Sequence, residues 1–349
     1  MLIDIIRKLE NRAPVELTDD ERQRLIDVFM DHGCYQYVKM LDKSIDLSFV
    51  ANKSRVIYSS CQKVFEMLND LGIPYAVLKG MPLSLLAYGD ADGRASRDID
   101  VLVSPSSYKE IHNALTLSGF SQGRLINGQV KKIGREEKLF YLHNTHQSSP
   151  YFLETSSAIV PFVEMDINFQ LIWPQRDIKL DTEMFLENLS DFSVEGYTIK
   201  TLIPLYFFVA LCLHHYKDMN SIYILYRKKR ISLRRYCDIY YYLKNNQVAC
   251  SVSQLTEIAQ QFSISPYLYY CLYYCYLIFH DDFLQPYMES LKTEYGIYLV
   301  DRFGLNEDEQ KVWTIPYYER IFSNSLHHYF DQILPPQDLK NIELNYRYM

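Results

Sequence analysis

The chain has 349 residues, a length that suits two structural units or one domain with large helical additions. Hydrophobic residues make up 48% of it and charged residues 23%, as in a folded protein with a sizeable core. The formal net charge of -7 excludes a general nucleic-acid coat, because such binding depends on many Lys and Arg contacts to phosphates. It leaves room for one local basic site.

The seven cysteines are an odd number without a CxxC pair, and no secretory signal precedes them, so we expect reduced thiols in a cytoplasmic protein. Cys271 and Cys275 stand one helical turn apart, but no His or second Cys pair stands at ligand spacing, which favours buried hydrophobic roles. The apolar runs 202–213 and 267–279 are shorter than the ~18 residues of a membrane span and suit buried helices. The first twelve residues read as an amphipathic helix rather than a targeting peptide.

Residues 1–72 are predicted to be helical. Thr18 is placed as an N-cap with Glu21 three residues later, a capping box before an apolar-periodic run. Apolar residues recur at helical spacing over 54–71, and the helix is expected to stop at Gly72.

The period changes at residue 73. "IPYAVLKG" predicts a short strand ending at Gly80, and "MPLSLLAYG" a helix with Pro82 in its first turn. "RDIDVLV" (97–103) predicts a second strand, and "SPSSYKEIHNALTLSGF" (104–120) a helix that begins at a Ser/Pro cap.

Shorter alternating runs follow at 129–134 and 137–144, then a polar loop around 144–157 and a strand within 159–173. From about residue 200 the pattern is helical to the end. We therefore expect an α+β fold, a small mixed β-sheet covered by helices. The expected boundaries are an N-terminal helical segment (1–72), a core (73–195) and a C-terminal helical domain (196–349).

Two acidic stretches are candidates for a metal site. Asp98 and Asp100 alternate with apolar residues on one strand, so both side chains project the same way, roughly 7 Å apart. Neighbouring carboxylates repel unless a cation relieves them, and Mg²⁺ prefers one or two carboxylates with phosphate oxygens and water. Asp166, or Glu164 on the same face, adds a third carboxylate from a later strand. Three such groups suit a two-metal site that activates a nucleophile and stabilises a leaving pyrophosphate.

Basic residues beside these strands are candidates for phosphate binding. Gly80 lies where a strand passes into a helix, a place where backbone N–H groups favour phosphate, and Lys79 adds a positive charge. Arg94 and Arg97 precede the Asp pair, and Arg suits bidentate contact with phosphate oxygens.

Each of these motifs alone has an ordinary explanation. An Asp-x-Asp pair is usually solvated, and strand-Gly-helix turns are common connectors. Their combination in this order, with a third acidic strand downstream, is far more specific. No Walker-type GxxxxGK[ST], GxGxxG after a strand, HExxH or GxSxG motif occurs, so P-loop kinases, dinucleotide enzymes, zincins and α/β-hydrolases are not favoured.

The string "LKG…YGDADGRASRDIDVLV…VEMDINF" resembles the nucleotidyltransferase superfamily of DNA polymerase beta type, and within it an uncharacterised bacterial branch. The resemblance covers 75–103 well, 162–170 moderately and 202–243 loosely. It implies an α/β nucleotidyltransferase core and Mg²⁺- or Mn²⁺-dependent transfer of a nucleoside monophosphate from an NTP, ATP first among them, to a hydroxyl or similar acceptor.

By the same resemblance, Asp98 and Asp100 match the metal-binding pair, and Asp166 matches the third acid, which activates the acceptor. Lys79, Gly80 and Arg94 match the turn and branch signature. The helical region around 202–243 adds four second-tier candidates, His214, Lys217, Arg234 and Asp238. Of these, Lys217 and Arg234 are expected to bind the nucleotide.

One position departs from the family pattern. The usual turn serine is Met81 here, so a hydroxyl contact to the terminal phosphate is absent, and Ser84 lies a turn later. This departure keeps open a second hypothesis, a nucleotide-binding regulatory protein without transfer activity.

A basic run gives a third hypothesis, a toxin-like RNA-modifying transferase. The run packs its cations into nine positions, namely Arg227, Lys228, Lys229, Arg230, Arg234 and Arg235. A solvated loop and helix start is the ordinary explanation. The adjacent His214 and His215 cannot face the same way on a helix, and a zinc role is not favoured without partners at ligand spacing.

Overall fold

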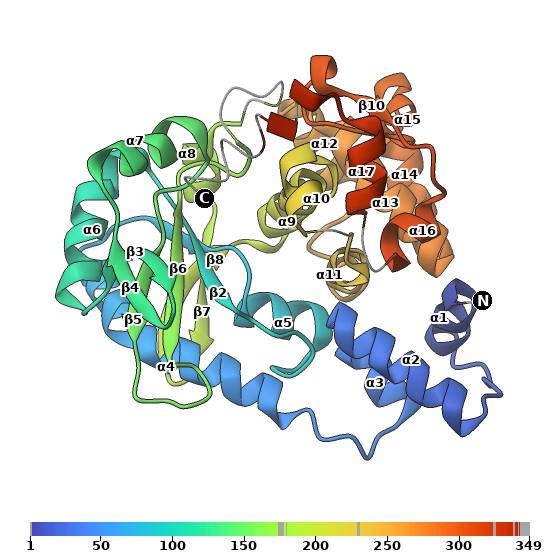
Figure 1. Cartoon of the computed structure of the whole chain (residues 1–349), viewed down its shortest axis with the longest axis horizontal. Helices are drawn as coiled ribbons and strands as arrows, with labels where there is room; N and C mark the ends of the chain where they lie inside the picture. The colour runs from blue at the N-terminus through green and yellow to red at the C-terminus, as the bar shows by residue number, and fades with distance from the viewer. Residues whose placement is uncertain are drawn as a thin grey trace.

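The computed structural model describes residues 2–173, 178, 180–228, 231–323, 326–337, 339–340 and 342. The fold is α+β, as expected: a mixed sheet lies beside a large helical bundle, with helix α5 (Met81–Tyr88) between them (Figure 1). The N-terminal helices lie below the bundle, and the long helix α4 runs from them across the sheet (Figure 1).

The sheet has six strands in the order β1-β2-β6-β5-β3-β4. Their bounds are β1 Tyr75–Val77, β2 Asp98–Val103, β3 Ser121–Ile126, β4 Gln129–Lys132, β5 Tyr151–Glu154 and β6 Phe162–Asn168. The second and third strands in this order, β2 and β6, pair in parallel, and the other pairs are antiparallel. In the parallel pair Asp98 is aligned with Glu164 and Asp100 with Asp166.

A separate hairpin of β7 (Leu189–Val194) and β8 (Tyr197–Leu202) packs beside β1, where the Thr201 hydroxyl donates to the Val77 carbonyl oxygen at 2.8 Å. The sequence analysis did not anticipate these strands. The expected boundary between 195 and 196 falls in the turn that joins them. The division of the chain into three domains stays a prediction.

Helices make up most of the rest of the chain. Before and within the sheet they are α1 Leu2–Glu10, α2 Asp19–His32, α3 Tyr35–Leu41, α4 Ser48–Asp70, α5, α6 Tyr108–Leu117, α7 Arg135–Asn144 and α8 Thr182–Leu186. The bundle contains α9 Pro204–Asn220, α10 Ile222–Lys228, α11 Leu233–Asn245, α12 Val252–Gln261, α13 Ser265–Phe279, α14 Gln285–Leu291, α15 Glu294–Leu299, α16 Tyr317–Phe322 and α17 His327–Ile333. Short strands β9 (Arg302–Phe303) and β10 (Lys311–Val312) pair within it.

Local sequence signals fix several helix ends as predicted. Thr18 and Glu21 form the capping box of α2, with the Thr18 N–H donating to the Glu21 carboxylate at 2.9 Å. Pro82 lies in the first turn of α5, and Gly89 ends that helix in the left-handed conformation.

Two predicted segments are wrong. Residues 137–144, read as an alternating run, lie in helix α7, whose first turn carries Glu136 and Glu137 and which buries only Tyr141. A helix with one buried residue has little apolar periodicity to detect. The predicted loop at 144–157 contains β5, which is held by antiparallel pairing to both β6 and β3, a non-local interaction.

The buried residues form two clusters, one around the sheet with α4 and α6, the other within the helical bundle. Helices α9 and α13 are buried on nearly all sides, which explains their continuous apolar sequence. All seven cysteines are buried free thiols, and Cys271 and Cys275 donate to backbone carbonyls of the core. Among the described residues, the helices are too short or too polar to cross a membrane.

Gly80 is required by close packing at the β1–α5 turn. Its φ is +76°, and an added Cβ would lie 2.2 Å from the hydroxyl oxygen of Tyr58. Gly80→Ala should therefore lower the free energy of unfolding by about 3 kcal/mol or more, through backbone strain and overpacking together. The measurement is chemical denaturation of the purified variant.

Gly89→Ala is the matched control, because Gly89 also has a positive φ of +80° but nothing lies within 4 Å of the place that a Cβ would take there. This variant should lose only about 1 kcal/mol, the backbone cost alone. Equal losses in the two variants would contradict the packing explanation.

Candidate active site

Four carboxylates meet where β2 and β6 run side by side. In a parallel pair, aligned residues project from the same face of the sheet, and residues two apart on one strand share that face. The register therefore places Asp98 and Asp100 of β2 next to Glu164 and Asp166 of β6. The three predicted metal ligands and the alternative Glu164 are thus neighbours.

Burial and the neighbouring carboxylates both act on the pKa of Asp166. Burial, followed by the charges of Glu164, Asp100 and Asp98, raises the pKa of Asp166 well above its usual range. Its Oδ1 atom is buried and accepts no hydrogen bond. A cation bound at this place would stabilise a buried carboxylate oxygen that has no hydrogen-bond donor.

Lys79 provides a positive charge at this cluster. Its ammonium lies 2.7 Å from Asp100 Oδ2 and donates to His214 Nε2 at 2.9 Å. Burial alone would lower the pKa of Lys79, but the charges of Asp100 and Asp98 outweigh it and raise the pKa. For His214, burial and the charge of Lys79 hold the pKa well below its usual range, so the imidazole is neutral and accepts the hydrogen bond.

Asn168 also contacts the carboxylates, and the sequence analysis did not single it out. Its Nδ2 donates to the Asp166 carbonyl oxygen at 3.2 Å and lies 3.5 Å from Asp100 Oδ1. Its position two residues beyond Asp166, on the same face of β6, is the signal that identifies it.

The opposite side of the site is basic and comes from α9 and α11. Lys217 is buried and donates to His146 Nε2 at 3.0 Å, and burial together with this lysine holds the pKa of His146 well below its usual range. Arg235 pairs with Asp218 at 3.0 Å. Arg234 contacts the Ala95 carbonyl oxygen at 3.5 Å, and burial lowers its pKa.

The start of α11 is fixed by the N-terminal segment. The Leu233 N–H donates to His32 Nδ1 at 3.1 Å, and the Ser232 hydroxyl donates to the His32 carbonyl oxygen at 3.2 Å. His32 therefore takes the part of a helix cap for the turn that carries Arg234.

Asp238 is the buried centre of a second network. Arg94 Nε contacts both of its carboxylate oxygens, at 3.2 and 3.1 Å, and the Tyr88 hydroxyl donates to it at 2.8 Å. His215 Nε2 lies 3.2 Å from Oδ2. Although burial would raise the pKa of Asp238, the Arg94 charge and the His215 hydrogen bond lower it, so the carboxylate is ionised.

One cavity of about 490 Å³ joins the acidic and basic sides. Eight of the nine predicted site residues line it: Lys79, Arg94, Arg97, Asp98, Asp100, Asp166, Lys217 and Arg234. The cavity wall also includes residues that no sequence pattern singled out, namely Tyr141, Thr145, His146, Gln147, Pro150, Trp173, Asp218, Tyr223 and Ile224. Trp173 and Tyr223 bring two aromatic rings 5.8 Å apart into this wall.

Gly80 is the predicted residue that is not part of the cavity wall. The Met81 N–H donates to the Tyr58 hydroxyl at 3.1 Å, and Met81 itself is buried in the core of the sheet. The backbone at this turn is thus engaged with Tyr58. Phosphate binding by Gly80 stays a prediction, and Lys79 reaches the cavity through its side chain.

The basic run divides in the structure. Arg234 and Arg235 line the cavity. Lys229 and Arg230, and the side chains of Arg227 and Lys228, lie outside the described residues. The hypothesis of an RNA contact at 227–230 stays a prediction.

The donor set fits Mg²⁺, which takes oxygen ligands and is commonly held by one or two carboxylates and substrate phosphates. Within the described ranges, no three His, Cys, Asp or Glu side chains already surround a metal position. The carboxylates are instead held beside the Lys79 ammonium. The arrangement suits a metal that arrives with a phosphate ligand rather than one held by a complete protein cage.

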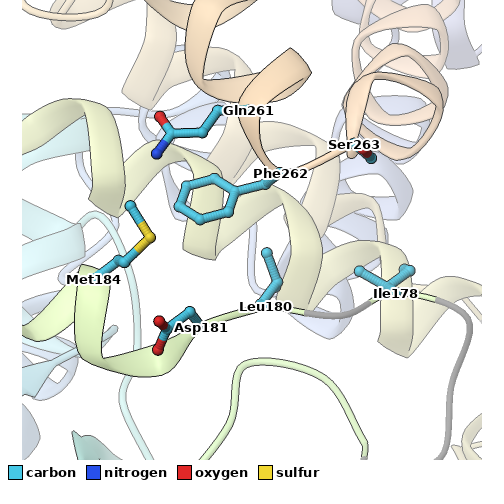
Figure 2. A pocket seen from close by; sticks show the side chains of 7 residues that line it. All are labelled: Ile178, Leu180, Asp181, Met184, Gln261, Phe262 and Ser263. Carbon is cyan, nitrogen blue, oxygen red and sulfur yellow. The ribbon is translucent and has the colours of Figure 1, made fainter.

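A larger cavity of about 590 Å³ lies between residues 178–184 and the end of α12 (Figure 2). Among the described residues of its lining, Asp181 is charged, and it caps α8 by accepting the Glu183 N–H at 3.0 Å. Phe262, Leu180 and Ile178 contribute apolar surface (Figure 2).

Residues 32–280 match the family described as uncharacterised nucleotidyltransferases, and the chain belongs to that family. The matched region contains both acidic strands and the helices α9 and α11. Membership supports a transferase acting in nucleotidyl transfer and implies an NTP substrate. No curated protein matches the chain.

Among solved structures, the chain is similar to an antigenic nucleotidyltransferase-like protein from Paracoccidioides brasiliensis. The two are 18% identical, with a TM-score of 0.35, over 66% of this chain and 98% of the other. A likeness this distant adds nothing to the functional conclusion.

Asp238→Asn should lower the free energy of unfolding by about 3 kcal/mol, because Arg94 would remain buried without its counter-charge. Asp191→Asn is the control, because Asp191 pairs with Lys200 on the surface, where such pairs contribute less than about 1 kcal/mol. Both values come from urea denaturation at neutral pH. Similar small losses in the two variants would contradict the assigned role of Asp238.

His215 should make stability fall with acid. Burial lowers the pKa of His215 to about 4 in the folded protein. In the unfolded chain the same imidazole takes up its proton near pH 6.5, so between these two pH values only the unfolded chain is protonated there. The contribution of His215 to the free energy of unfolding is therefore complete above pH 6.5 and is lost as the pH falls towards 4. Removing this group by His215→Gln should reduce the slope of unfolding free energy against pH by up to about 1.4 kcal/mol per unit.

The measurement compares urea denaturation of wild type and His215→Gln at several pH values between 6.5 and 4.5. His146 and His214 also have lowered pKa values, so part of the slope should remain in the variant. An unchanged slope would show that His215 is protonated alike in both states.

Proposed function

We propose that the protein is a Mg²⁺- or Mn²⁺-dependent nucleotidyltransferase that moves a nucleoside monophosphate from an NTP to a hydroxyl-type acceptor and releases pyrophosphate. The observation that carries the proposal is the single cavity in which two acidic strands face cationic helices. Family membership points the same way. ATP is the first nucleotide to test.

The acidic side would serve the metal and the acceptor. Asp98 and Asp100 would hold the metal ion, with Asp166 towards the acceptor. When bound, the ion neutralises phosphate charge and polarises the α-phosphoryl group. Asp166 is the candidate to take the acceptor's proton, since it is a carboxylate aligned with Asp100 on the neighbouring strand, beside the proposed metal pair.

The basic side would hold the triphosphate. Cations on the cavity wall are available for its oxygens: Lys79, Arg94, Arg97, Lys217 and Arg234. The acceptor oxygen bonds to the α-phosphorus, the bond from that phosphorus to the β-bridging oxygen breaks, and pyrophosphate leaves with the electron pair. Trp173 and Tyr223 offer rings on which a base would stack.

A second candidate is a regulatory protein that binds a nucleotide without transferring it. Met81 takes the place of the usual turn serine and is buried, while its N–H donates to Tyr58, so this turn offers no hydroxyl to a phosphate. Under either function we propose a cytoplasmic protein, since seven buried free thiols suit a reducing compartment.

The test incubates the protein with α-labelled ATP, GTP, CTP and UTP and Mg²⁺ or Mn²⁺, followed by fractions of cell extract as acceptor. Wild type should give labelled product and pyrophosphate, and Asp98→Ala/Asp100→Ala should reduce the rate at least about 100-fold, because the metal ligands are removed. Asp191→Ala, an exposed carboxylate outside the cavity, is the control and should match wild type.

The outcomes separate the two candidates. Nucleotide binding by wild type without product in any fraction would favour the regulatory protein. Binding of no nucleotide by any variant would contradict both.

A further inference from the structure

Lys79 joins the two halves of the cavity. It follows β1, and its ammonium contacts Asp100 on β2 at 2.7 Å and His214 on α9 at 2.9 Å. The Lys79 side chain is 13% exposed and the Asp100 side chain 7%. The ion pair is therefore formed away from most of the solvent, where it is screened little.

The same carboxylate is one of the two residues assigned to the metal. A divalent ion on Asp100 would lie within a few ångströms of the ammonium, and like charges at that distance repel strongly in a partly buried site. The flexible four-carbon stem of lysine allows the ammonium to move instead. A triphosphate in the cavity would offer it new oxygens.

We propose that Lys79 is a tethered counter-cation that competes with the divalent metal for Asp100 and passes to the triphosphate when metal and nucleotide bind. The inference rests on the proposed function and deepens it, since it explains how the metal ion gains access to Asp100. Metal alone must displace the ammonium, whereas metal with nucleotide supplies the ammonium with a new partner. Because coupling between two ligands is reciprocal, each should strengthen binding of the other.

His214 fits this exchange as the second contact of Lys79. Its imidazole is neutral and accepts a hydrogen bond from the ammonium without adding a competing negative charge.

The experiment measures Mn²⁺ binding without nucleotide, by the electron paramagnetic resonance signal of free Mn²⁺. Lys79→Met should bind Mn²⁺ about tenfold more tightly than wild type, because the competing charge is gone. Lys79→Arg keeps the charge and should not gain affinity. Lys200→Met, which removes a surface cation paired with Asp191 outside the cavity, should match wild type.

A second measurement uses a non-hydrolysable NTP analogue with saturating Mn²⁺. Here Lys79→Met should bind the analogue about tenfold more weakly than wild type, since a phosphate contact is lost. Opposite signs for metal and nucleotide are the signature of the exchange. Should Lys79→Met fail to fold, Lys79→Gln removes the charge while keeping a hydrogen-bond donor for Asp100.

Equal Mn²⁺ affinity in wild type and the uncharged variants would overturn the exchange while leaving the proposed function intact. Weaker Mn²⁺ binding by those variants would overturn it as well. Absence of Mn²⁺ binding in every variant, with and without the analogue, would overturn the exchange and the metal-dependent function together.

Discussion

The parallel pairing of β2 with β6 concentrates negative charge, and the surrounding residues are arranged around that charge. One register aligns Asp98 with Glu164 and Asp100 with Asp166, so four carboxylates share one face of the sheet. Such a group is unstable unless protons or cations neutralise it. The structure shows both responses, a raised pKa at Asp166 and an ammonium at Asp100. Binding chemistry and structural stability therefore depend on the same strand pair.

The basic half of the site is stabilised in a different way. Its buried cations are set against neutral histidines or a buried carboxylate: Lys217 donates to His146, and Arg94 pairs with Asp238. A neutral imidazole accepts the hydrogen bond without placing a negative charge beside the lysine. The carboxylate contact instead orients Arg94, because it engages the Nε edge of the guanidinium. Several cations are thereby held close together on one wall of the cavity.

Much of the acidic side of the cavity could be located from the sequence because its residues lie on short local patterns. Alternation along one strand placed Asp98 and Asp100 together, and a strand-Gly-helix pattern located Lys79. The alignment of Asp166 with Asp100 is a long-range pairing, and without the family resemblance no local pattern specifies it. His146 and Tyr141 come from a segment with little apolar periodicity, read as a strand and a loop. The β7–β8 hairpin was missed because β7 alternates weakly and the hairpin packs beside β1 from far along the chain, although β8 alternates between buried and less buried residues.

The contact between His32 and the first turn of α11 gives the N-terminal segment a share in the cavity. The family match begins at this histidine, so an alignment alone would treat the preceding helices as an optional extension. The Leu233 N–H and the Ser232 hydroxyl both bond to His32, one residue from Arg234. Gly33 lies against the Arg234 side chain, where an added Cβ would be 3.4 Å from Cδ. A chain trimmed to the matched region would keep His32 but lose most of helix α2, which ends at His32 and holds it beside Arg234 of the cavity wall. The natural unit for expression and redesign is therefore longer than the region that matches the family.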